Sequence, residues 1–77
     1  MGNPQILADL SVDPYMQVRV AVARNRATPS DILIALASDS EIGVREAVAS
    51  NPAAPPEAVA MLATDENWSV RKAVATR

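Results

Sequence analysis

The sequence contains no cysteine, no histidine and no phenylalanine, and it has only one tryptophan and one tyrosine. Without cysteine there are no disulfides, thiolate metal sites or cysteine nucleophiles. Without histidine the commonest general base and metal ligand is missing. The only two glycines, Gly2 and Gly43, do not form the glycine-rich loop that phosphate-binding sites use. These absences favour a protein that is not an enzyme and that holds no metal or cofactor.

Long apolar runs and a strong excess of one charge are absent as well. No apolar run approaches the roughly 20 residues that a transmembrane helix needs, and the N-terminus does not resemble a signal peptide. The net charge of −2 does not favour nucleic-acid or membrane binding. We therefore expect a soluble, cytoplasmic protein that does not bind membranes.

Small apolar residues dominate what is present. Ala, Val, Leu and Ile let helices approach one another closely, and Ala is the best helix former. Seventy-seven residues make at most one small domain, which buries only about 60% of the surface that the unfolded chain exposes. The composition therefore predicts closely packed short helices in a single domain covering residues 1–77.

An internal repeat organises the chain. The dipeptide Val-Arg occurs three times at a constant spacing of 26 residues, at 18–19, 44–45 and 70–71. The same spacing aligns three leucines (Leu10, Leu36, Leu62) and three aspartates (Asp13, Asp39, Asp65). An Ala-Val-Ala run follows each of the three arginines. The sequence therefore predicts three tandem repeats, at approximately residues 1–25, 26–51 and 52–77.

Each repeat contains the signals of two short helices. Thr28 followed by Pro29 is typical of an N-cap and a first helical position, and an apolar stripe at helical spacing follows. The repeated Asp is expected to cap the second helix, which ends at Asn25 or Asn51 because Asn tolerates the left-handed conformation. No segment alternates polar and apolar residues as a strand does, so the fold class is all-α.

A unit of two short helices cannot bury its own apolar stripe. It must therefore stack on copies of itself, and three units are about the minimum for a stable array. The expected architecture is an α-solenoid in which the second helices line one surface.

The pattern N-x3-P-x3-L-x2-L-A-x-D-x4-V-R-x2-V-A-x-N runs from Asn25 to Asn51. It resembles the leucine-rich repeat variant (LRV) family, and its Asp and Val-Arg portion is shared with HEAT-like repeats. A second, partial match ends in Arg77, where Asn is expected. The resemblance implies a right-handed superhelix and leaves open whether the short first helices are α or 3₁₀. An iron–sulfur cluster bound by cysteines accompanies some LRV repeats, but it does not carry over to a chain without cysteine.

The aspartates and arginines that repeat together form a possible ladder. Its members are Asp13, Arg19, Asp39, Arg45, Asp65 and Arg71. Three stacked arginines could bind an anion. The alternative is that each Asp pairs with the Arg of its own or the neighbouring repeat. Because the arrangement recurs in every unit, the structural interpretation is favoured.

The basic residues lie in or just after the second helices. This distribution allows a second function, weak binding of nucleic acid or another polyanion. It is equally expected of cations near helix C-termini, where they complement the helix dipole. With three arginines assigned to the ladder and no interleaved aromatic residues, nucleic acid is the less favoured partner, and a protein partner is preferred.

One set of second-helix positions varies between repeats while the core positions do not. The predicted partner-binding face comprises Gln17, Val20, Arg24, Gly43, Glu46, Ser50, Ser69, Lys72 and Thr76. Variable residues suit a concave binding surface, although unconstrained solvent-facing positions would look the same. The function expected is that of a non-enzymatic scaffold for protein–protein interaction.

Self-association is the other form of interaction that the sequence predicts. In an isolated third repeat the apolar residues Leu62, Trp68, Val70 and Val74 are expected to face solvent. Bulky side chains in the column Met16, Ile42 and Trp68 are otherwise expected to pack between repeats. We therefore expect a homodimer formed through a terminal repeat.

Overall fold

The computed structural model describes residues 3–77, which form six α-helices and no strand. The helices are α1 (Pro4–Leu10), α2 (Met16–Arg24), α3 (Ser30–Leu36), α4 (Ile42–Ser50), α5 (Pro56–Ala63) and α6 (Trp68–Ala75). The all-α prediction is therefore confirmed.

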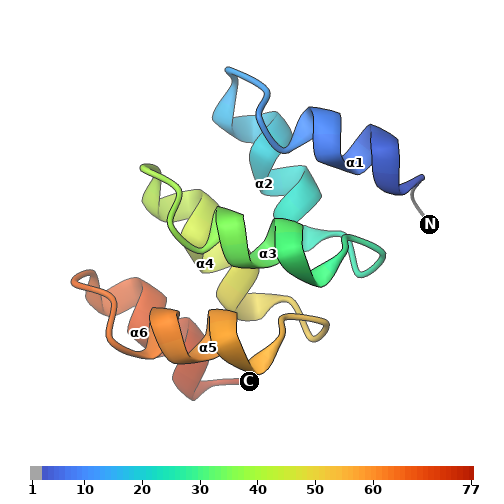
Figure 1. The fold of residues 1–77 in the computed structure, drawn as a ribbon. Helices are drawn as coiled ribbons and strands as arrows, with labels where there is room; N and C mark the ends of the chain where they lie inside the picture. The colour runs from blue at the N-terminus through green and yellow to red at the C-terminus, as the bar shows by residue number, and fades with distance from the viewer. Residues whose placement is uncertain (1–2) are drawn as a thin grey trace.

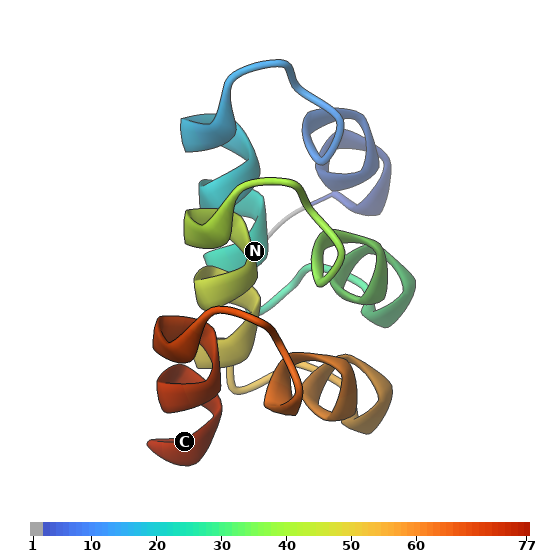
Figure 2. The same cartoon turned by 90° about the vertical axis from the view of Figure 1, so that its left-hand side faces the viewer.

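The helices stack as three antiparallel pairs, α1–α2, α3–α4 and α5–α6 (Figure 1). The second helices α2, α4 and α6 form one column and the first helices α1, α3 and α5 form the other, as Figure 2 shows from the side. Helix α4 packs against both α2 and α6, and each first helix packs against the second helix of its pair. This arrangement is the two-layered helical solenoid that the repeat predicts.

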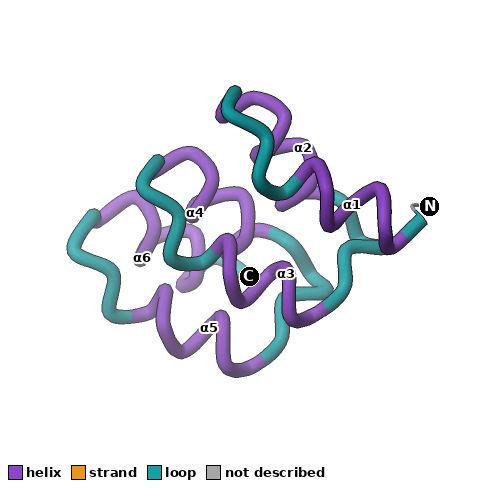
Figure 3. Tube along the Cα trace, turned by 45° about the horizontal axis from the view of Figure 1, so that its top comes forward, coloured by secondary structure: helices purple, strands orange, loops and turns teal. Residues whose placement is uncertain are grey.

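The turns of the solenoid lie on two opposite edges. Turns within a pair lie on one edge, and connections between pairs lie on the other (Figure 3). Each second helix therefore starts at the first edge, where the repeated Asp lies, and ends at the second edge, where the repeated Asn lies. The two kinds of polar residue are thus held apart by the length of a helix.

The first helices are α-helices, which settles the alternative that the family resemblance left open. In α3 the backbone N–H of Ala37 donates to the carbonyl of Leu33 at 3.0 Å, the spacing of an α-helix. A second bond to Ile34 at 3.2 Å tightens only the last turn. Leu33 and Leu36 are both buried by this geometry, because residues three apart lie on the same face of an α-helix.

The predicted helix starts are partly correct. Asn3 caps α1, since its side-chain oxygen accepts from the backbone N–H of Gln5 at 2.8 Å. Thr28 does not cap α3. Its hydroxyl is buried and donates to the carbonyl of Val22 at 2.7 Å, and α3 starts at Ser30 without a side-chain cap. Thr28 therefore satisfies an end carbonyl of the preceding helix instead of a starting N–H.

The repeated aspartates do not cap the second helices directly. The Asp13 carboxylate accepts from the backbone N–H of Tyr15 at 2.9 Å, and α2 begins one residue later. Asp39 does the same with Glu41 before α4. These Asx turns shape the approach to the helix and leave the other side of each carboxylate available for an arginine.

The predicted left-handed ends of the second helices are wrong. Asn25 (φ −76°, ψ 121°) and Asn51 (φ −78°, ψ 118°) are both extended. Each backbone N–H donates to the residue three before it, and each carbonyl accepts from the residue three after it (Thr28 and Ala54), so a turn follows the helix end at once. The asparagines are kept extended by the use of their side chains in contacts described below.

The core lies between the two layers and between successive pairs. Its fully buried side chains include Leu33, Val44 and Val48. Leu62 and Val70, which the sequence predicts to be exposed, are also fully buried, because they point back toward the α3–α4 pair. They are therefore unavailable to a partner.

Candidate functional site

A ladder of ion pairs joins successive pairs at the starts of the second helices. Arg19 Nε donates to Asp39 Oδ2 at 2.8 Å, and Nη2 donates to Oδ1 at 3.2 Å. Arg45 makes the same contacts to Asp65, at 2.8 and 3.4 Å. The four side chains retain between 9% and 15% of their exposure, so both pairs are largely shielded from solvent.

Each arginine also binds the turn of its own pair. Arg19 Nη1 donates to the carbonyl of Asp13 at 2.8 Å, and Arg45 Nη1 donates to that of Asp39 at 2.7 Å. One guanidinium thus connects the turns of two consecutive pairs, using the fixed fork of donors that Lys lacks. Arginines held this way stabilise the stack and are not available to bind an anion.

The arginines lower the pKa of the carboxylates that they bind. Burial alone raises the pKa of Asp39, but the hydrogen bonds from Arg19 and from the Glu41 backbone, together with the charges of Arg19 and Arg45, outweigh it. The pKa of Asp39 is therefore lower than usual. The pKa of Asp65 is lowered in the same way, with burial opposed by Arg45.

A second ladder, at the ends of the second helices, uses amides. The Asn51 side chain is buried, and its Nδ2 donates to the carbonyls of Ala23 at 2.8 Å and Asn25 at 3.1 Å in the preceding pair. Its Oδ1 accepts from the backbone N–H of Ala53 at 2.8 Å. Asn51 therefore satisfies the end carbonyls of α2, which have no partner within their own helix.

Arg77 occupies the same position in the third pair. Its Nη1 donates to the carbonyls of Ala49 at 2.6 Å and Asn51 at 3.1 Å, which are the equivalents of the two carbonyls that Asn51 binds. Sequence reasoning missed this ladder, because the Asn was assigned a local role as helix terminator. The 26-residue register, which aligns Arg77 with the two asparagines, was the signal that could have found it.

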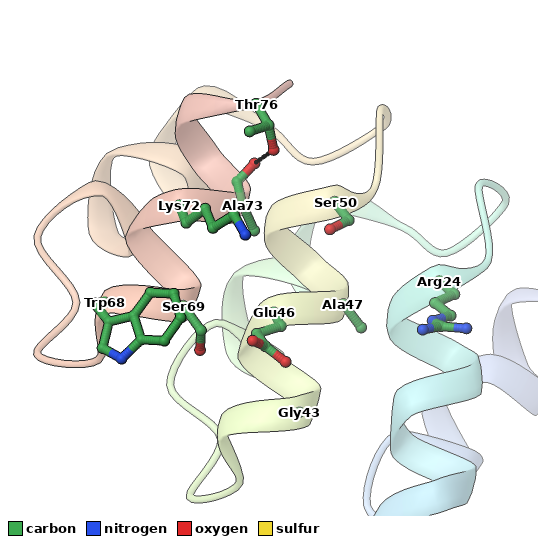
Figure 4. A pocket seen from close by; sticks show the side chains of 10 residues that line it. All are labelled: Arg24, Gly43, Glu46, Ala47, Ser50, Trp68, Ser69, Lys72, Ala73 and Thr76. Atoms are coloured by element: carbon green, nitrogen blue, oxygen red, sulfur yellow. Dashed lines mark hydrogen bonds between the residues drawn. The ribbon is translucent and has the colours of Figure 1, made fainter.

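A hollow of about 440 Å³ lies on the second-helix side of the solenoid, between α4 and α6 and open toward α2. Its lining consists of Arg24, Gly43, Glu46, Ala47, Ser50, Trp68, Ser69, Lys72, Ala73 and Thr76 (Figure 4). Seven of the nine residues of the predicted partner-binding face are among them. Of the other two, Gln17 is exposed elsewhere, and Val20 is half-buried against the core.

The hollow combines charges of both signs with one exposed aromatic ring. Lys72 Nζ lies 6.0 Å from the centre of the Trp68 ring, and both residues come from α6. Glu46 projects from α4 between these residues and Arg24 of α2 (Figure 4). Trp68 is 66% exposed, which agrees with the expectation that it faces solvent in an isolated third repeat.

Gly43 allows α2 and α4 to approach closely at one end of the hollow. A Cβ at this position would lie 3.1 Å from the terminal methyl of Met16. Because Gly43 has no side chain, the Met16 methyl packs directly against the next pair at this position. Met16 therefore reaches from the first pair toward the second.

Residues 3–77 contain no group of three acidic or metal-ligating side chains that could hold a metal ion. None of the helices in that range is long and apolar enough to cross a membrane.

The stacked pairs and their two ladders define a helical-repeat protein of the α-solenoid class. The sequence model of the leucine rich repeat variant family matches residues 17–41 and 42–67. The chain therefore belongs to the leucine rich repeat variant family, whose unit is a structural repeat. No curated protein and no solved structure matches the chain.

Proposed function

We propose that this protein is a non-enzymatic interaction module whose second-helix face binds a segment of a partner protein. The observation that carries the proposal is the hollow between α4 and α6, which is lined by the positions that vary between repeats. Solenoids bind partners on such a surface, because the positions that are the same in every repeat build the stack and the positions that vary between repeats are free to differ.

The chemistry of the hollow indicates what the segment carries. The exposed Trp68 ring is a large, rigid anchor of the type enriched at binding hot spots. Lys72 lies beside it and offers a cation to a carboxylate. We therefore infer a short segment with an aromatic or long aliphatic side chain next to an acidic residue.

The arrangement of the cations argues against nucleic acid as the partner. Arg19 and Arg45 are committed to Asp39 and Asp65, and Arg77 donates to backbone carbonyls. The hollow also contains the acidic Glu46, which phosphates would approach at a cost. A single aromatic ring is no platform for stacked bases.

The test is selection of binders from a random peptide library displayed on phage, with the immobilised chain as target. Selected peptides are synthesised and titrated by calorimetry against the wild type and against Lys72→Glu and Trp68→Ala. Each variant changes an exposed side chain of α6, so the fold should be retained. We expect acidic–aromatic peptides, and a dissociation constant at least about tenfold higher for each variant, equivalent to about 1.4 kcal/mol.

The matched control is Arg26→Glu, which reverses an exposed charge outside the hollow. It should leave the dissociation constant unchanged. Peptides that bind the wild type and both hollow variants equally would refute this site. Tight binding of duplex or single-stranded oligonucleotides, with a steep dependence on salt, would show that the partner is a nucleic acid and not a protein segment.

A further inference from the structure

The first pair exposes apolar positions that the other pairs bury. Leu10 is 37% exposed, whereas its equivalents Leu36 and Leu62 are 3% and 0% exposed. The difference arises because this position points toward the preceding pair. Ile6 is likewise 57% exposed at this end, while Ala58, two repeats along in its column, is fully buried. This outer side of α1–α2 is called the leading face below.

The third pair exposes the complementary positions. Ala75 is exposed, whereas its equivalents Ala23 and Ala49 are fully buried. Ala63 at the end of α5 is exposed in the same way, while its equivalent Ala37 is 4% exposed. These positions point toward a following pair. The outer side of α5–α6 is called the trailing face below.

The ion-pair ladder has one unused half on each of these faces. On the trailing face, the Arg71 guanidinium donates only to the carbonyl of Asp65 at 2.6 Å, and no carboxylate within residues 3–77 binds its remaining donors. On the leading face, the Asp13 carboxylate accepts from Tyr15, and no arginine of the described chain binds it. One face therefore presents a cation and the other an anion at the same place in the repeat.

The amide ladder is unused in the same complementary way. Asn25, on the first pair, has no acceptor for its Nδ2 within residues 3–77, although its equivalent Asn51 makes two bonds. The carbonyls that correspond to those two bonds on the third pair belong to Ala75 and Arg77. A donor at one end thus matches two acceptors at the other.

We propose that the trailing face of one copy binds the leading face of a second copy, so that the solenoid continues from molecule to molecule. Asp13 of the second copy then pairs with Arg71, and Asn25 of the second copy donates to the carbonyls of Ala75 and Arg77. The apolar positions of the two faces cover one another as they do between pairs within the chain. The chain already forms this interface twice, between its first and second pairs and between its second and third.

The two faces differ, so the contact is heterologous and does not close on itself in a dimer. Association should therefore give a series of growing oligomers and not a single symmetric dimer. Trp68 reports on it, because it has the place in the third pair that Met16, whose methyl faces Gly43 of the following pair, has in the first. A stacked copy covers the exposed Trp68 ring and should shift its emission to shorter wavelengths.

The test uses sedimentation velocity over a wide range of protein concentrations, with Trp68 emission recorded in parallel. The wild type should show an average mass that rises with concentration. Arg71→Asp and Asp13→Arg each place like charges on the two faces, so each alone should stay monomeric where the wild type associates. An equimolar mixture should regain association, because every contact between unlike variants again joins an arginine to an aspartate.

The controls separate a charge effect from loss of the fold. Circular dichroism checks that each variant keeps its helices. Asp13→Asn, which retains an oxygen for the Tyr15 N–H, should weaken association without affecting the turn. Arg26→Glu should associate as the wild type does, because this exposed residue belongs to neither ladder and does not line the hollow. A wild type that is monomeric at every concentration, or a mixture of folded variants that does not associate, would overturn the proposal.

Discussion

The solenoid joins its pairs by different means at its two edges. At the starts of the second helices, Arg19 and Arg45 reach forward to carboxylates of the next pair. At their ends, the amide of Asn51 reaches back to backbone carbonyls of the preceding pair. The first ladder uses charge in side chains that are still partly exposed, whereas the second uses a neutral group that is almost completely buried.

The comparison shows how the cost of breaking a contact depends on what it leaves behind. Removing one member of a partly exposed ion pair lets water reach the other. Removing a buried amide leaves carbonyls that water reaches poorly, and each carries a desolvation penalty. The buried contacts of Asn51 should therefore matter more for stability, although they involve no charge.

The largest effect is expected for Asn51→Leu. The change removes two bonds to the carbonyls of Ala23 and Asn25 and one from the N–H of Ala53. With these buried groups unpaired, the free energy of unfolding should fall by about 3 kcal/mol. Urea unfolding followed by circular dichroism measures the change.

Asn25→Leu is the matched control for that variant. Asn25 has the same place in its repeat and its side chain accepts from Ala27, but this side chain makes no bond to another pair within the described chain. The Asn25 carbonyl that accepts from Asn51 belongs to the backbone and is kept, so loss of the side chain should cost about 1 kcal/mol or less. Equal costs at the two positions would show that Asn51 acts only on its own turn.

A smaller effect is expected for Asp65→Asn in the ion-pair ladder. The substitution keeps an oxygen for the Asn67 N–H and removes the charge that Arg45 binds. The free energy of unfolding should fall by about 1 kcal/mol, as expected of an ion pair that retains some contact with solvent. Asp13→Asn, tested at a concentration where the chain is monomeric, should change it much less. A cost at Asp65 above that at Asn51 would reverse the ranking of the two ladders.

The ladders should also differ in their response to pH. The native pKa of Asp39 and Asp65 lies below the unfolded value of about 3.9. Between the native and the unfolded pKa, the unfolded state therefore binds more protons than the native state. The stabilisation by the two carboxylates is fully present above about pH 4 and is lost as the pH falls further. Asp39→Asn together with Asp65→Asn should flatten the fall in stability below pH 4, whereas Asn51→Leu should lower stability by the same amount at each pH. Parallel curves for the wild type and the double variant would contradict the shifts.

The fold could be predicted from the sequence because every signal repeats. The Val-Arg, Leu and Asp columns predict the three helix pairs, but they leave open whether each arginine binds the Asp of its own or of the neighbouring repeat. Most of the hollow was also predictable, since its residues alternate with core positions on the second helices. Trp68 is not among the residues predicted for this face, because the sequence analysis assigns it to self-association through the third repeat.

The amide ladder could not be predicted in the same way. An Asn at a helix end has a local explanation, the left-handed conformation, and the structure shows an extended backbone instead. The side chain of Asn51 bonds 26 and 28 residues away, so its partners depend on how the pairs stack. Leu62 and Val70 are predicted to be exposed for a related reason. The sequence does not say whether a side chain points toward the preceding or the following pair.

The smallest effect is expected at Arg77, where the amide ladder uses a charged residue at an exposed position. Arg77→Ala removes the bonds to the carbonyls of Ala49 and Asn51, but water can replace them, so the loss should be about 0.5 kcal/mol. Arg77→Asn places the shorter amide at the position that Asn51 holds in the preceding pair. If the two carbonyls need only a hydrogen-bond donor at this position, Arg77→Asn should recover the stability lost in Arg77→Ala. Urea unfolding of the wild type and the two variants measures this. If Arg77→Asn is no more stable than Arg77→Ala, the shorter amide side chain does not reach the carbonyls that the guanidinium reaches.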